Sequence, residues 1–69
     1  MKIARNEALL IKDDLEKVFK KYKLKVYLNI ENDFLLNMYI SYKDDIKHID
    51  LDKFTKLSEL YNYINTLLI

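Results

Sequence analysis

The chain of 69 residues contains no glycine, proline, cysteine or tryptophan. Without cysteine it can form neither a disulfide framework nor a thiolate metal site, and it has no thiol nucleophile. Without glycine it lacks the phosphate-binding loop and the dinucleotide-binding fingerprint, because both need glycine where the backbone approaches phosphate. These absences exclude several large classes of enzyme.

Long apolar runs are also absent. The longest uninterrupted run extends from Ala8 to Ile11, whereas a membrane-spanning helix needs about 18 apolar residues and a signal-peptide core roughly 7 to 15. The sequence therefore predicts a cytoplasmic protein with no membrane contact.

The overall composition is that of a folded domain. Apolar residues make up 51% of the chain and the net charge is +1, a combination that does not fit a disordered polyelectrolyte. A chain this short buries only about 60% of the surface that its unfolded form exposes, which leaves little room for an enclosed active site. We expect one domain covering residues 1–69.

The composition also carries information about the gene. Residues with AT-rich codons (Phe, Ile, Tyr, Met, Asn and Lys) number 36, whereas Gly, Ala, Arg and Pro together number 3. The coding DNA must be very AT-rich, as in a low-GC bacterium or one of its phages or plasmids.

Hydrophobic periodicity predicts a helix at the start of the chain. Between Ile3 and Tyr22 the apolar residues recur at spacings of four and three, which is the pattern of an amphipathic helix. Lys20, Lys21 and Lys23 gather at its end, where the helix dipole favours positive charge.

The period then changes to two, which predicts a hairpin of two strands. A two-residue turn at Asn32 and Asp33 would put the two apolar rows on opposite faces of the sheet, so we expect a three-residue loop from Glu31 to Asp33. The apolar rows are Leu24, Val26, Leu28 and Ile30 in the first strand and Phe34, Leu36, Met38, Ile40 and Tyr42 in the second.

A third strand and a second helix complete the predicted fold. After a turn at residues 43–45, the segment from Ile46 to Phe54 fits no single alternation and is interpreted as a short edge strand with a bulge. The second helix is expected to begin near Thr55 as its N-cap. The predicted fold class is α+β, a two-layer α-β-β-β-α domain whose three-stranded antiparallel sheet has both helices on one face.

This arrangement leaves the other face of the sheet open, and aromatic residues fall on it. Tyrosine provides a large contact area at small entropic cost and is common at protein interfaces. Tyr63 falls on the outer side of the second helix. The open face is expected to carry Lys25, Tyr27, Asn29, Leu35, Asn37, Tyr39 and Ser41, and the predicted partner-binding residues are Lys25, Tyr27, Asn29, Asn37, Tyr39 and Tyr63.

No pattern in the sequence predicts catalysis. His48, Asp50 and Asp52 have the alternate spacing of a metal-binding trio on a strand, but such a group is more often a solvated strand edge. The pairs Asp13–Asp14 and Asp44–Asp45 are more typical of helix surfaces and turns than of an acid–base pair. We therefore expect no catalytic residue, no metal and no cofactor.

Two alternatives to protein binding stay open. Lysines concentrated at the junction of the first helix and first strand, next to Tyr27 and Tyr39, suggest a nucleic-acid contact, although 12 basic residues are nearly balanced by 11 acidic ones. The open face or the edge strand also suits self-association as a homodimer. The lysines of the basic cluster are Lys17, Lys20, Lys21, Lys23 and Lys25.

The favoured hypothesis is a non-enzymatic protein-binding module. Its size and AT-rich coding suggest an inhibitor encoded by a phage or another mobile element, directed against a host defence protein in the manner of anti-CRISPR proteins. The net charge of +1 speaks against mimicry of DNA by the whole surface. Only a local acidic run offers such mimicry: Asp44, Asp45, Asp50 and Asp52.

Overall fold

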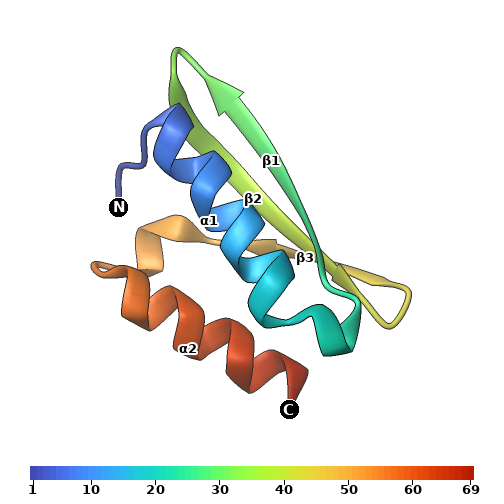
Figure 1. Ribbon diagram of the computed structural model, residues 1–69. Coiled ribbons are helices and arrows are strands. Elements are labelled where there is room, and N and C mark those ends of the chain that lie inside the picture. The colour runs from blue at the N-terminus through green and yellow to red at the C-terminus, as the bar shows by residue number, and fades with distance from the viewer.

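Three antiparallel strands form one layer of the molecule and two helices form the other (Figure 1). The computed structural model describes all residues from 1 to 69. The strands pair in the order β1-β2-β3, so β2 is central. This confirms the predicted α+β class. The elements are α1 (Arg5–Val18), the 3-10 turn η1 (Lys20–Tyr22), β1 (Lys25–Glu31), β2 (Phe34–Tyr42), β3 (Asp45–Ile49), the 3-10 turn η2 (Leu51–Lys53) and α2 (Leu57–Leu68).

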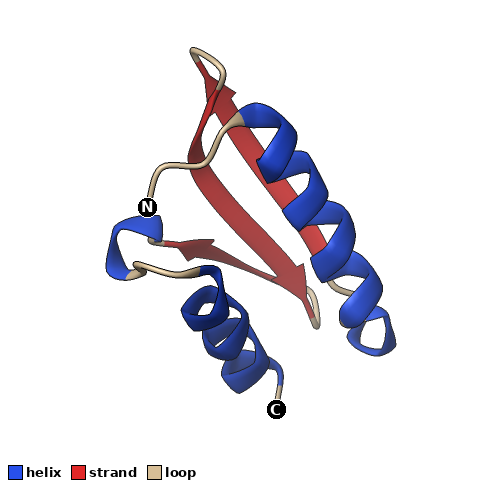
Figure 2. Cartoon of the chain, turned by 60° about the vertical axis from the view of Figure 1, so that its left-hand side comes forward, coloured by secondary structure: helices blue, strands red, loops and turns tan.

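Both helices cover the same face of the sheet (Figure 2). Ala8, Ile11 and Leu15 of α1 are buried, as are Leu60 and Ile64 of α2. Apolar burial at spacings of three and four is what an amphipathic helix provides. The core contains no buried polar side chain. Its sixteen residues are Ile3, Ala8, Ile11, Leu15, Phe19, Leu24, Val26, Leu35, Met38, Ile40, Ile49, Leu51, Phe54, Leu60, Ile64 and Leu68.

The first helix begins later than predicted, because the residues before it belong to the sheet. Leu35 donates its N–H to the carbonyl of Ile3 at 2.8 Å, and Ala4 forms an antiparallel bridge with Phe34. β3 pairs with β2 only from Met38 onward. The N-terminal segment therefore covers the part of the β2 edge that β3 leaves free.

The loop between β1 and β2 has two residues, not the three predicted. Asn32 and Asp33 both have left-handed backbone angles, with φ of 53° and 65°, and Glu31 pairs with Phe34. Such a turn matches the twist of a hairpin. The mismatch between the apolar rows that this turn creates is removed by a bulge at Leu36.

The bulge inserts one residue into β2. Ile30 pairs with Leu35 and Asn29 pairs with Asn37, so Leu36 has no partner. An extra residue on one strand reverses the face on which later residues lie. Leu35 is therefore buried at 8% exposure, while Leu36 is 53% exposed. Phe34 and Leu36 were predicted in the core and Leu35 on the open face, and all three predictions are wrong for this reason.

The third strand is a short edge strand, as predicted, but it has no bulge. Its pairing with β2 is regular from Tyr42↔Asp45 to Met38↔Ile49. The alternation fails after Ile49 because Leu51 lies in η2, where Asp50 accepts a hydrogen bond from the N–H of Asp52 at 3.1 Å.

The second helix begins at Leu57 with Lys56 as its N-cap, so the prediction of Thr55 in that role is wrong. The Glu59 carboxylate instead accepts hydrogen bonds from the N–H and the hydroxyl of Thr55, both at 2.8 Å, and from the N–H of Lys56 at 3.1 Å. The Thr55 N–H, Thr55 hydroxyl and Lys56 N–H, in that order, hold the pKa of Glu59 below its usual value. Negative charge in a first turn stabilises a helix.

Left-handed residues take the place of glycine in every tight turn. The β2–β3 turn uses Lys43 and Asp44, with φ of 50° and 62°. Lysine has no local hydrogen bond with which to offset this conformation, which costs roughly 1–2 kcal/mol for an L-residue. Asparagine or glycine at position 43 would reduce this free-energy cost, but lysine does not.

The double substitution Lys43→Asn and Asp44→Gly should therefore raise the free energy of unfolding by about 1 kcal/mol, because Asn-Gly is the preferred sequence of this turn. Urea denaturation measures the difference. Lys43→Ala with Asp44→Ala should lower stability instead, and equal effects of the two pairs would contradict the turn geometry.

Glu16 connects α1 to the outer edge of β1. Its carboxylate accepts the N–H of Val26 at 2.9 Å and pairs with the Lys12 ammonium at 3.0 Å. Partial burial acts to raise the pKa of Glu16, but the hydrogen bonds from Val26 and Lys12 and the charge of Lys12 outweigh burial and lower it. The ionised form thus holds the helix against an otherwise unpaired strand edge.

Because the folded pKa of Glu16 lies below the ordinary 4.5, its stabilisation is complete above that pH and is lost as the pH falls through the folded pKa. Glu16→Gln should lower the free energy of unfolding by about 1 kcal/mol near neutral pH. The difference from wild type should shrink as the pH drops below 4.5. Asp13→Asn, an exposed change on the same helix, serves as control, and a pH-independent loss in Glu16→Gln would contradict this role.

Candidate functional site

The open face of the sheet carries a row of three rings. Tyr27 on β1 pairs directly with Tyr39 on β2, which pairs directly with His48 on β3. The rings of Tyr39 and His48 have their centroids 5.1 Å apart. Directly opposed residues lie on the same face of an antiparallel pair. The row therefore crosses the sheet from one edge to the other.

Polar side chains lie beside this row. Asn29 pairs with Asn37, and the Asn37 side-chain oxygen lies 3.4 Å from His48 Nε2. On the other side Lys25 pairs with Ser41, which pairs with Ile46. The aromatic row is thus flanked by amide and hydroxyl groups.

Large apolar side chains extend the same surface. Leu36 is 53% exposed and Ile46 is 66% exposed, while Tyr27 is exposed by 54%. Exposed apolar groups are ordinary when scattered, but a contiguous group marks an interaction surface. We call this surface the sheet face, and its main residues are Tyr27, Phe34, Leu36, Tyr39, Ile46 and His48.

The structure brings together most of the predicted partner-binding residues. Lys25, Tyr27, Asn29, Asn37 and Tyr39 all lie on the open side of the sheet. Tyr63 lies in the helical layer, where its ring packs on Phe54 with the centroids 5.5 Å apart. It therefore belongs to a different surface.

Sequence reasoning missed four residues of the sheet face: Phe34, Leu36, Ile46 and His48. Phe34 and Leu36 were assigned to the core because no residue pattern predicts the bulge. The alternation of Ile46 and His48 was visible in the sequence, but the irregularity at Leu51 obscured it. A strand ending at Ile49 would have placed both on the open face.

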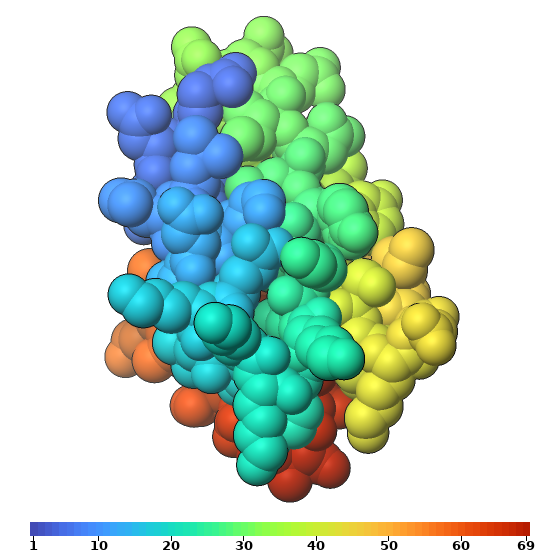
Figure 3. Space-filling view, turned by 45° about the vertical axis from the view of Figure 1, so that its right-hand side comes forward, coloured from blue at the N-terminus to red at the C-terminus, as the bar shows by residue number.

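The basic cluster lies at one end of the molecule, around the end of α1 and the start of β1 (Figure 3). Lys20, Lys23 and Lys25 line a hollow of about 520 Å³ together with Glu16 and Leu24. Lys17 and Lys21 are exposed nearby, and the ammonium of Lys21 lies 6.0 Å from the centre of the Tyr22 ring.

The histidine and its neighbouring aspartates do not form a metal site. No three His, Cys, Asp or Glu side chains gather in a way that could hold a metal ion. His48 contacts Tyr39, and Asp50 holds the η2 turn. Within the acidic run, Asp45 accepts the N–H of Ile46 at 3.0 Å. These side chains have structural partners in the fold.

A shallow groove runs between the two helices. Leu10 and Asp14 of α1 line it with Leu57 and Tyr61 of α2. The Tyr61 hydroxyl donates a hydrogen bond to the Asp14 carboxylate at 2.7 Å. Burial, followed by this hydrogen bond and the charge of Asp14, raises the pKa of Tyr61 to about 12. This pair links the helices across the groove.

An ultraviolet absorbance titration should therefore show one tyrosine that ionises well above the ordinary value of 10.0. Tyr61→Phe should remove that component, and Asp14→Asn should move it toward 10.0 because the acceptor's charge is gone. Circular dichroism at the same pH verifies that the fold persists. If Asp14→Asn leaves the component in place, the hydrogen bond is not its cause.

Comparisons with protein-family models, with curated proteins and with solved structures give no match for this chain. Neither helix has the length and apolar character needed to span a bilayer.

Proposed function

We propose that the protein is a non-enzymatic binding module that docks another protein on its sheet face. The observation that carries this proposal is the aromatic row of Tyr27, Tyr39 and His48, which stands open to solvent with exposed Leu36 and Ile46 around it. Tyrosine and other aromatic residues at the centre of a surface are typical hot spots of protein interfaces.

The charge of the sheet face supports a protein partner over nucleic acid. β2 contributes no charged side chain to this face, and β1 contributes Lys25 at one end and Glu31 at the other. The Lys2 ammonium lies at the margin, 4.3 Å from the centre of the Phe34 ring. Binding of nucleic acid depends on many positive contacts to phosphate. An apolar centre with a polar rim instead matches the anatomy of a protein interface.

The rim defines the chemistry of the partner. Asn29, Asn37 and Ser41 offer donors and acceptors beside the rings, while the rings and Leu36 offer apolar area. A fitting partner presents an apolar patch bordered by uncharged hydrogen-bonding groups. The more specific hypothesis, a mobile-element inhibitor of a host defence protein, is supported by the small size and the AT-rich composition and stays a prediction.

Replacement of both ring anchors tests the proposal. Tyr27→Thr with Tyr39→Thr should weaken partner binding by a factor of about 30 or more, the effect of losing a hot spot. Threonine retains strand preference, so the sheet should persist. The tagged protein is used to isolate a stoichiometric partner from its native host, and affinity is then measured with the purified partner.

Tyr63→Thr is the matched control, because Tyr63 and Tyr39 are both 37% exposed but lie in different layers. It should bind the partner as wild type does. Equal affinity of wild type and the Tyr27/Tyr39 variant would contradict the proposal. Sedimentation analysis distinguishes the alternative of self-association, since a dimer that the same variant dissociates would identify a second copy as the occupant.

A further inference from the structure

Positive charge is concentrated at one end of the molecule. Residues 17–25 contain five lysines and no acidic residue. The fold brings Lys43 of the β2–β3 turn to the same end, because the hollow lined by Lys20, Lys23 and Lys25 adjoins a second one that shares Lys23. The second hollow measures about 390 Å³ and is lined by Tyr22, Lys23, Ser41, Tyr42, Lys43 and Asp44. We call Lys20, Lys23, Lys25 and Lys43 the basic end.

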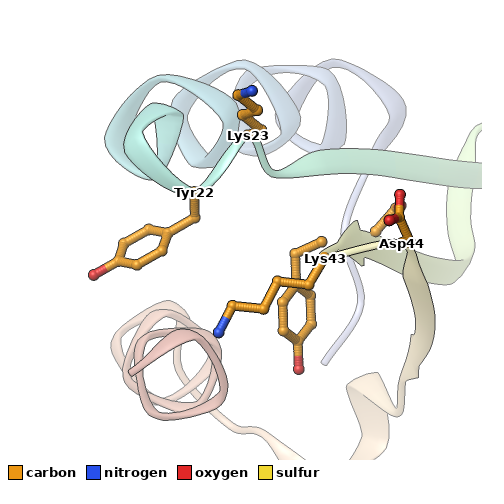
Figure 4. Close-up of a pocket in the computed structure, with 6 residues that line it drawn as sticks. Tyr22, Lys23, Lys43 and Asp44 are labelled. Atoms are coloured by element: carbon orange, nitrogen blue, oxygen red, sulfur yellow. The ribbon is translucent and has the colours of Figure 1, made fainter.

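The second hollow lies between two separate turns (Figure 4). Tyr22 comes from η1 and Lys43 from the β2–β3 turn. The Tyr22 ring and the Lys43 side chain extend on the same side, toward α2. Two lysines and two tyrosines from segments far apart in sequence therefore line one hollow.

The ammonium groups of the basic end form no ion pair within the protein. The ion pairs of the structure are Arg5–Asp33 and Lys12–Glu16. Glu16, which lines the first hollow, accepts hydrogen bonds from the Lys12 ammonium and the Val26 N–H, and the charge of Lys25 also acts on it. Asp44 lines the second hollow. Four lysine ammonium groups that form no ion pair therefore lie around two hollows whose lining contains two carboxylates, those of Glu16 and Asp44.

Two of the four lysines of the basic end lie at strained backbone positions. Lys23 and Lys43 both have left-handed backbone angles, with φ of 57° and 50°. Left-handed positions favour glycine, asparagine and aspartate, and the β1–β2 turn uses Asn32 and Asp33. Residues in sparsely populated conformations cluster at functional sites, although in this glycine-free chain every tight turn uses such a residue. Here the constrained residue at both positions is a lysine.

We infer that the basic end binds consecutive phosphates of a nucleic-acid backbone without sequence preference. Lysine acts as a point charge toward phosphate, and no arginine is present here to read a guanine edge in bidentate fashion. Two adjoining hollows provide separate positions for neighbouring phosphates. The site is distinct from the sheet face, which it meets at Lys25 and Ser41, and the inference does not depend on the proposed function.

Salt dependence gives a quantitative test. Binding of fluorescent 20-nucleotide single-stranded and duplex DNA is measured by anisotropy over a range of salt concentration. Four lysine–phosphate contacts predict a slope of log K against log salt of about −3.6 for duplex and about −2.8 for single strands. Either nucleic acid with its expected slope supports the inference, and absence of binding to both at low salt overturns it.

Matched charge variants locate the site. Lys20→Gln, Lys23→Asn, Lys25→Gln and Lys43→Asn remove the basic end, with asparagine chosen where the backbone is left-handed. This variant should lose at least tenfold in affinity and most of its salt slope. The control removes the same charge elsewhere, by Lys2→Gln, Lys47→Gln, Lys53→Gln and Lys56→Gln, and should keep most of the binding.

Two further measurements make the result decisive. Arginine at the four positions of the basic end should restore binding, which a fold defect would not allow, and circular dichroism monitors the fold of each variant. Equal losses in the basic-end and control variants would overturn the inference, because net charge alone would then explain them. Polyglutamate that competes as well as DNA of equal charge would also overturn it, in favour of an acidic protein.

Discussion

The hairpin of β1 and β2 imposes the constraint on which the rest of the fold depends. Its left-handed two-residue turn sets a register in which apolar residues of one strand would lie opposite polar residues of the other. The unpaired Leu36 shifts this register by one residue after the first two residue pairs next to the turn. From Asn37 onward the apolar residues of both strands lie on the same face of the sheet. Val26, Met38 and Ile40 belong to this continuous apolar face. Both helices pack on that face. Without the extra residue there would be no single apolar face to cover.

The same bulge explains where reasoning from the sequence succeeds and fails. Strong periodicity identifies α1, α2 and the strands, because burial of one face is a property that residue spacing records directly. A bulge adds one residue and leaves the local pattern plausible on both sides, so Phe34 and Leu36 look like core residues. Thr55 looks like an N-cap, yet Glu59 satisfies the same donors from the third position of the helix. Such choices depend on three-dimensional context.

For the candidate surfaces too, sequence reasoning identifies some residues and misses others. Strand alternation correctly predicts that Tyr27, Tyr39 and the neighbouring asparagines lie on the open face. Leu36 and Phe34 become visible only once the register is known. The lysines of residues 17–25 are evident in the sequence, but the approach of Lys43 depends on how η1 and the β2–β3 turn meet in space. The fold thus separates an apolar surface with little charge from a charged end, although the sequence interleaves the two.

The pairing of Ile3 and Ala4 with β2 has a consequence for the order of folding. These residues are made before their partners Phe34 and Leu35, which lie about thirty residues later in the chain. Closing a loop of that length is slower than forming the local turns within it. We therefore expect the N-terminal segment to pair with β2 only after the hairpin has formed. Ile3 and Ala4 leave the ribosome before their partners do, so Ile3 stays exposed to other chains until the hairpin has formed.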